Sequence, residues 1–200
     1  MTIPAMADDK LLEYSGEHLL HELTMLWELA QTLPRRKAST ETSALVESFG
    51  IHLRNLIDFF YRPGRLDDVT AQDFLDATTV WNPSEPASLT NAHRRANKEL
   101  SHLTQTRKSG TPPEKEWDTI GLAREIEAIA KDFAAKASDR KLHFKVREFL
   151  QIPATKLKVW IGDNSPRLNV AVQAPLSSEI GTGEPLPPAR SKLNGCARQN

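Results

Sequence analysis

One stretch of the sequence, residues 91–107, gathers the side chains that phosphate chemistry uses. Arg95 and His102 lie seven positions apart, so at about 100° per residue their directions differ by only about 20° around an α-helix. Lys98 falls near the same edge of that helix, whereas Asn97 lies on the other flank. An imidazole can transfer a proton, and a guanidinium or an ammonium can stabilise charge on phosphate oxygens. The spacing therefore predicts an edge suited to an anionic ligand such as a phosphodiester.

The alternative is that these polar residues are solvated side chains of an amphipathic helix. The same helix carries an apolar stripe, formed by Leu89, Ala92, Ala96, Leu100 and Leu103. Arg95 and His102 lie about 100 to 120° from the centre of that stripe, where residues flank a core without any chemical role. Arg94, Arg95 and Lys98 make the edge basic under either interpretation.

The preceding predicted helix also carries polar residues among apolar ones, namely Arg54, Asn55 and Asp58. Arg54 and Asp58 have the i, i+4 spacing of a helical ion pair, which would be worth a few tenths of a kcal/mol if exposed. Alternatively, Asp58 or Asn55 reaches across to the 91–107 helix and holds Arg95 or Asn97. Partial burial between apolar neighbours would require such a partner.

The sequence offers little for other kinds of site. His18, His21 and Glu22 have helical spacings that a metal could use, but a further ligand does not follow nearby, and surface positions explain them. Cys196 lacks a neighbouring His or Asp that would make it a nucleophile. Gly-rich phosphate loops and nucleophile elbows do not occur in the sequence. We therefore expect neither a metal nor a cofactor.

The elements that position these residues are predicted to be helices. Apolar residues recur at spacings of three, four and seven over residues 8–33, before Pro34. A second helix begins at a cap among residues 39–42 and ends at Tyr61. Further helices are predicted over residues 70–75 and 87–107, from about 114, and over 140–150, the last continuing the previous one after a bend or standing alone. Three large aromatic residues of these stripes are expected in the core: Trp27, Trp117 and Phe133.

Composition divides the chain into a helical domain, residues 1–152, and a Pro-rich tail, residues 153–200. That tail holds six of the 13 prolines and four of the nine glycines. Alternation at period two predicts a small β-hairpin over residues 156–172, and disorder is expected beyond about residue 175. The expected fold class is all-α, a bundle of four to five helices with a largely irregular C-terminal tail.

Charge and cysteine content narrow the class of protein. The chain carries 26 basic and 26 acidic side chains, so binding of nucleic acid by bulk electrostatics is excluded. Residues 1–150 hold 20 basic and 23 acidic side chains, so an RNA contact is expected only at the Arg94, Arg95 and Lys98 edge. A single cysteine fits a reducing compartment. Without an apolar run of 18 residues or a signal-peptide pattern, we expect a cytoplasmic protein that does not span a membrane.

The stretch from Arg95 to Thr104 resembles the signature helix of the HEPN superfamily (higher eukaryotes and prokaryotes nucleotide-binding), whose hallmark is Arg, four to six residues, then His. Asn97-Lys98, three residues, then His102-Leu103-Thr104, after a helix such as residues 48–61, is similar to the abortive-infection U-type branch of that superfamily.

The resemblance implies a helical bundle that dimerises so that two signature helices face each other across a cleft. It also implies a metal-independent endoribonuclease of a bacterial defence or toxin–antitoxin system, with RNA as substrate and a cognate antitoxin or other protein as partner. His102 would be the general acid or base and Arg95 the transition-state cation, with Asn97, Lys98 and Arg94 binding. If Asn97 occupies the arginine position instead, the chain would be a catalytically silent module that binds RNA, nucleotide or protein.

Overall fold

The computed structural model describes residues 6–65, 67–100 and 116–152. Within those ranges the regular structure is entirely helical, which confirms the predicted all-α class. The predicted hairpin over residues 156–172, the rest of the Pro-rich tail and His102 lie outside the described residues.

The helices follow one another in three groups along the chain. The first group is α1 (Asp8–Tyr14), the π-helical segment η1 (Ser15–Leu19), α2 (Leu20–Thr32) and the 3₁₀ turn η2 (Leu33–Arg35). The second is α3 (Thr40–Tyr61), the 3₁₀ turn η3 (Ala71–Phe74), α4 (Ala87–Arg95) and the π-helical segment η4 (Ala96–Leu100). The third is α5 (Thr119–Lys136) and α6 (Phe144–Gln151).

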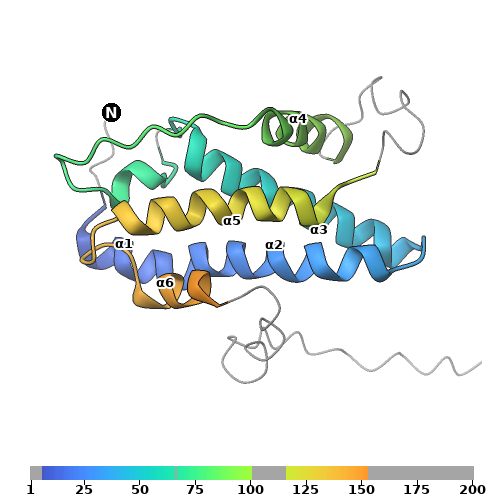
Figure 1. The fold of residues 1–200 in the computed structure, drawn as a ribbon, viewed down its shortest axis with the longest axis horizontal. Helices are drawn as coiled ribbons and strands as arrows, with labels where there is room; N and C mark the ends of the chain where they lie inside the picture. The colour runs from blue at the N-terminus through green and yellow to red at the C-terminus, as the bar shows by residue number, and fades with distance from the viewer. Residues whose placement is uncertain (1–5, 66, 101–115, 153–200) are drawn as a thin grey trace, which may run out of the picture. The chain divides into compact units, whose positions relative to one another are not determined.

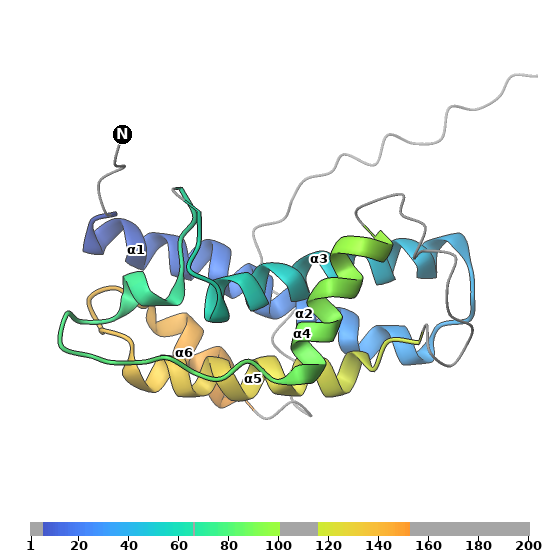
Figure 2. The same ribbon diagram turned by 90° about the horizontal axis from the view of Figure 1, so that it is seen from above.

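The helices α2, α3 and α5 form the body of the bundle. α3 runs back along α2, and α5 packs against both of them (Figure 1). α6 contacts α5 and η1, while α4 and η4 lie across α3 on the side opposite to α6 (Figures 1 and 2). The signature stretch is therefore held directly on the surface of α3.

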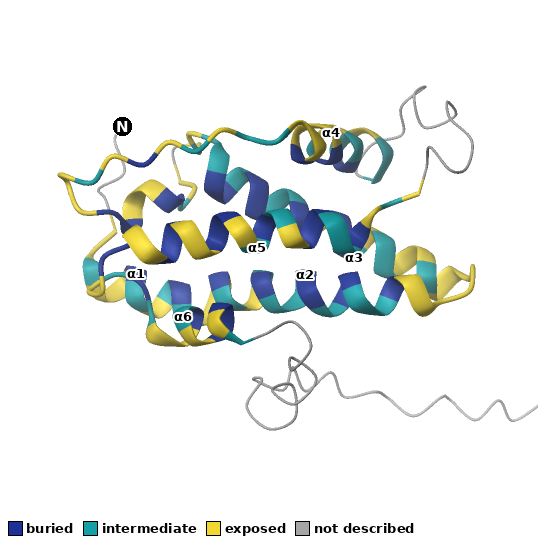
Figure 3. Ribbon diagram, viewed as in Figure 1, coloured by how far each residue is buried: buried dark blue, intermediate teal, exposed yellow. Residues whose placement is uncertain are grey.

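The core is continuous through the bundle, and its buried residues line the inward faces of the helices (Figure 3). Rings of Phe59, Phe60, Phe74 and Phe133 meet edge to face, with centroids 5.0 to 5.9 Å apart. Such aromatic pairs add stability beyond the area that they bury. Phe133 and Trp27 are buried, as predicted, and Trp117 packs half-buried against the core.

An extended segment between η3 and α4 crosses the bundle and is anchored by Trp81. The Trp81 ring is buried, and its Nε1 donates to Asp132 Oδ2 at 2.6 Å. Gln72 Nε2 donates to the Trp81 carbonyl oxygen at 2.8 Å. These contacts fix the start of α4, and hence the position of the signature stretch, relative to α5.

The predicted helix starts are correct for α3 and wrong for α5 and α6. The Ser39 side chain caps α3 by accepting from the Thr42 amide at 3.1 Å. α5 begins at Thr119 rather than near residue 114, because Asp118 caps it by accepting from the Gly121 amide at 2.9 Å. α6 begins at Phe144 rather than at residue 140, after a turn that separates it from α5. None of the described helices combines the length and apolar character that a membrane crossing requires.

Candidate functional site

A cleft with a volume of about 920 Å³ opens over the C-terminal half of α3. Its walls are Tyr14 and His18 from α1 and η1 on one side, and His93 and Asn97 from α4 and η4 on the other. The segment after α3 closes one end. Figure 2 shows α3 lying between α1 and α4. The cleft therefore sits against the stretch that resembles the HEPN signature.

The floor of the cleft is the polar face of α3, formed by Arg54, Asn55, Asp58 and Arg62. Positions i, i+4 and i+8 follow one side of a helix, so these side chains emerge together. The apolar residues between them turn toward the core. The polar residues that stood out in the sequence of this helix are thus brought together in one cleft.

Asp58 holds a histidine of the neighbouring helix. His93 Nε2 lies 2.8 Å from Asp58 Oδ1, and Asn97 Nδ2 lies 3.3 Å from His93 Nδ1. A carboxylate can only accept a hydrogen bond, so His93 Nε2 carries the proton and Nδ1 of the neutral ring is the acceptor. Asp58 does reach across to α4, as one of the two sequence interpretations held, and its partner there is His93.

A second pair of the same kind ties α3 to α2. His52 Nδ1 lies 2.8 Å from Glu22 Oε2, and Asn55 Nδ2 donates to the same oxygen at 3.4 Å. The His52 side chain is 12% exposed and is not part of the cleft lining. Asn55 therefore orients a carboxylate at the wall of the cleft instead of contacting the signature stretch.

The cleft is mixed in charge rather than basic. Its ionisable lining residues are His18, Arg54, Arg62, Arg65 and His93, and Glu22, Asp58, Asp67 and Asp68. Arg62 donates from Nη2 to Glu85 Oε1 at 3.1 Å, and its buried Nε has no hydrogen-bond partner within the part of the chain that the structure describes. Burial, followed by the charges of Glu22 and Asp68, raises the pKa of Tyr14 above its ordinary value, so the Tyr14 hydroxyl stays protonated in the cleft.

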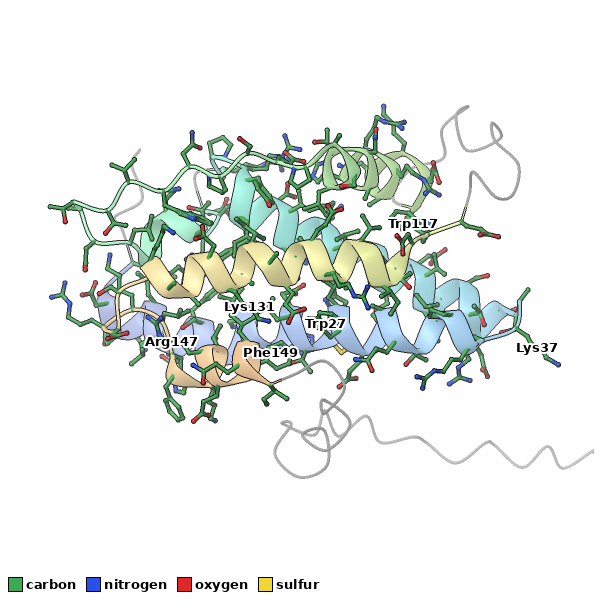
Figure 4. All side chains as sticks on the ribbon, viewed as in Figure 1. Trp27, Lys37, Trp117, Lys131, Arg147 and Phe149 are labelled. Carbon is green, nitrogen blue, oxygen red and sulfur yellow. The ribbon has the colours of Figure 1, made fainter. Side chains whose placement is uncertain are left out.

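Arg95 is held away from the cleft by contacts with residues before α5. Its guanidinium carbon lies 4.4 Å from the centre of the Trp117 ring, a cation–π contact at the end of the bundle labelled in Figure 4. Nε lies 3.2 Å from Glu99 Oε1, and Nη1 donates to the Glu116 carbonyl oxygen at 3.0 Å. The structure thus places Arg95 outside the cleft lining that contains Asn97.

The remaining residues predicted on this edge are not in the cleft. Arg94 and Lys98 are exposed and do not belong to its lining. The predicted alignment of Arg95 with His102 assumed an uninterrupted α-helix, and η4 interrupts it. A π-helical turn bonds residue i to i+5 and so holds more residues than an α-helical turn. Residues that follow such a segment are rotated relative to those before it.

Both π-helical segments border the cleft, η1 through His18 and Leu19 and η4 through Asn97. Gly50 of α3 makes room for η4, because a Cβ there would come within 2.1 Å of Leu100 Cδ1. Isolated π-helical turns within α-helices are frequent at functional sites. Their position on opposite walls of one cleft marks it as the candidate functional site.

Comparison with protein-family models, with curated proteins and with solved structures gave no match to this chain. Within the described residues, His, Cys, Asp and Glu side chains do not form a group of three that could hold a metal ion. The site is therefore interpreted from its own geometry.

Sequence reasoning found most of the cleft floor but missed His93. Arg54, Asn55 and Asp58 stood out as polar residues among apolar ones, whereas His93 drew no attention. The available signal was its spacing, because His93 and Asn97 are four residues apart and so share one side of a helix. The structure brings both of them to the wall of the cleft that Asp58 faces.

Proposed function

We propose that this chain is a HEPN-like helical protein of a bacterial defence or toxin–antitoxin system, and that it binds RNA in the cleft over α3. One observation carries the proposal. Asn97, from the stretch that resembles the HEPN signature, lines the same cleft as Arg54 and Arg62. The buried Arg62 Nε is unsatisfied within the described residues, and leaving such a donor unpaired costs about 1 to 3 kcal/mol. A phosphate oxygen in the cleft would remove that cost.

The size of the cleft supports this ligand class. Pockets for small ligands usually measure roughly 300 to 1,000 Å³, and a volume of about 920 Å³ holds a nucleotide unit. Asn55 and Asn97 supply amide groups that hydrogen-bond base edges or sugar hydroxyls. The arginines of α3 supply the cations for the backbone.

The mixed charge of the cleft means that few phosphates are neutralised. If Arg54 and Arg62 each meet one phosphate of a single strand, the logarithm of affinity falls with a slope of about −1.4 against the logarithm of salt. Affinity should then fall only about sevenfold between 50 and 200 mM salt. A protein that binds by a broad basic surface would lose far more.

Binding is proposed ahead of cleavage because of Arg95. The predicted transition-state cation is engaged by Glu99, Trp117 and the Glu116 carbonyl, and it does not line the cleft. Its contacts are those of a residue that fixes the signature helix against the start of α5.

A second candidate function is a metal-independent endoribonuclease that uses His102 and Arg95 across a homodimer. The observation that favours it is the rigidity of Arg95, whose guanidinium is fixed by three separate contacts. A preorganised cation is what stabilisation of a transition state requires. In this candidate the cleft positions the RNA, and a second copy of the chain completes the catalytic site.

Fluorescence anisotropy of a labelled single-stranded RNA, measured in EDTA, tests the binding function. Arg62→Gln should weaken binding about tenfold, because one charge-assisted hydrogen bond is lost. Arg124→Gln is the matched control, since Arg124 is an exposed arginine of α5 outside the cleft. Equal affinities for the two variants, or no binding by the wild-type protein, would contradict the proposal.

The same samples, resolved on a denaturing gel, test the second candidate. Cleavage in EDTA that disappears in His102→Ala would establish it. Intact RNA after prolonged incubation with the wild-type protein would exclude it and leave the binding function standing. Light scattering on the same preparation measures whether the chain is a dimer.

A further inference from the structure

The pair formed by Asp58 and His93 has the geometry of a proton-transfer site. We propose that His93 takes up a proton during cleavage of an RNA phosphodiester bound in the cleft, and that Asp58 is its positioning residue. The inference rests on the proposed function, because it requires RNA in the cleft. It assigns chemistry to a residue outside the Arg95 and His102 pair.

The hydrogen bonds of His93 leave one nitrogen suited to accept a proton. Nε2 donates to Asp58 Oδ1 at 2.8 Å, which fixes both the ring orientation and the tautomer. Nδ1 meets only the Asn97 amide nitrogen, at 3.3 Å, which is long for a hydrogen bond. A hydroxyl group of a ligand could replace that weak contact and reach Nδ1.

The surroundings of His93 fit a group that works on a ligand. Its side chain is 19% exposed and lines the cleft together with Asn97 and Arg54. A carboxylate behind an imidazole also stabilises the imidazolium that forms when the ring takes a proton. Asp58, with its side chain 46% exposed, retains contact with solvent.

The reaction follows from the chemistry of RNA. His93 Nδ1 removes the proton of a ribose 2′-hydroxyl, and the 2′-oxygen forms a bond to the adjacent phosphorus. The bond from phosphorus to the 5′-oxygen of the next nucleotide breaks, and that oxygen takes a proton from water. The products are a 2′,3′-cyclic phosphate and a 5′-hydroxyl, and the imidazolium returns its proton to solvent. Arginine in the same cleft can stabilise charge on the non-bridging oxygens.

The chain contains its own control in His52. Its Nδ1 lies 2.8 Å from Glu22 Oε2, so both histidines join two helices through a carboxylate at the same distance. His52 does not line the cleft. If the two pairs only held helices together, removal of either imidazole would have similar consequences for the protein.

The experiment compares His93→Gln with His52→Gln on the full chain, using a labelled single-stranded RNA in EDTA. We expect His93→Gln to bind RNA with unchanged affinity and to lower the cleavage rate by about 10²- to 10⁴-fold. His52→Gln should cleave at the wild-type rate. Asp58→Asn should lower kcat with little change in KM, because it disturbs the orientation of the ring.

Two further readouts separate catalysis from a structural role. The cleavage rate of the wild-type protein should rise with pH as an imidazole titrates, and His93→Gln should lose that dependence. Added imidazole should partly restore cleavage in His93→Ala, because the small molecule can enter the space left by the ring. Thermal unfolding of each variant shows whether the fold is retained.

The outcomes distinguish the inference from the proposed function. RNA that binds but is never cut overturns the inference and leaves the binding function intact. Equal rates for His93→Gln and the wild-type protein, or cleavage lost only in His102→Ala, also overturn it. If the wild-type protein does not bind RNA, the proposed function and the inference fall together.

Discussion

Replacing Arg95 by methionine tests whether this residue stabilises the fold or serves chemistry. The substitution keeps the length of the side chain and removes its charge. Three contacts are lost, to the Trp117 ring, to Glu99 and to the Glu116 carbonyl. A partly buried cation–π contact is worth about 1 kcal/mol, a helical i, i+4 ion pair about 0.5 kcal/mol, and a hydrogen bond to a carbonyl about 1 kcal/mol.

The sum predicts that Arg95→Met lowers the free energy of unfolding by about 2 to 3 kcal/mol. In a helical domain of this size the Tm should fall by roughly 6 to 12 °C. Circular dichroism at 222 nm measures the transition, and Arg94→Met is the matched control, because Arg94 is the adjacent, exposed residue of the same helix. That control should melt within about 2 °C of the wild-type protein.

The result that would refute this reasoning is a normal Tm for Arg95→Met together with the loss of RNA binding or cleavage. Arg95 would then act on the ligand, as the second candidate function requires. A lowered Tm with RNA affinity retained below the transition supports a structural role.

Three further predictions concern buried hydrogen bonds and titrating groups. Ser15→Ala should lower stability by about 1 to 3 kcal/mol, measured by urea unfolding, because the buried Ser15 hydroxyl accepts from the His143 amide at 2.9 Å. Burial, with the nearby charges of Glu85 and Glu125, raises the pKa of Tyr61 to about 12; absorbance at 295 nm should show it ionising near there, and stability should fall as pH rises above 10. Hydrogen bonds from Lys136 and Trp81 lower the pKa of Asp132, so the stabilisation it gives should be lost as pH falls below 3.8 and be missing in Asp132→Asn at pH 7.

Most of the helical framework was predictable because it depends on local spacing. The apolar stripe of α3 and its cap at Ser39 are written in neighbouring residues, and the structure has both. The short turn after Thr70 was predictable for the same reason, since Thr70 and Asp73 form a reciprocal cap. Starts that depend on a single competing cap, such as Asp118, were placed several residues too early.

The candidate site was only partly predictable because its contacts are distant in sequence. Asp58 and His93 are 35 residues apart, and nothing local links them. The contact between Arg95 and Trp117 joins two predicted helices whose relative position the sequence does not give. η4 also changes the angle between residues on either side of it, so a helical wheel built at a constant rotation misplaces them.

The central claim is that RNA occupies the cleft over α3, and photocrosslinking tests it most directly. Single-stranded RNA that contains 4-thiouridine is bound to the full chain, irradiated and digested, and the crosslinked peptides are identified by mass spectrometry. We predict crosslinks in peptides that contain residues 54–65 and 93–97, and their loss in Arg62→Gln. Crosslinks confined to the exposed basic residues 35–37 or to α5, with the cleft peptides unmodified, would contradict the claim.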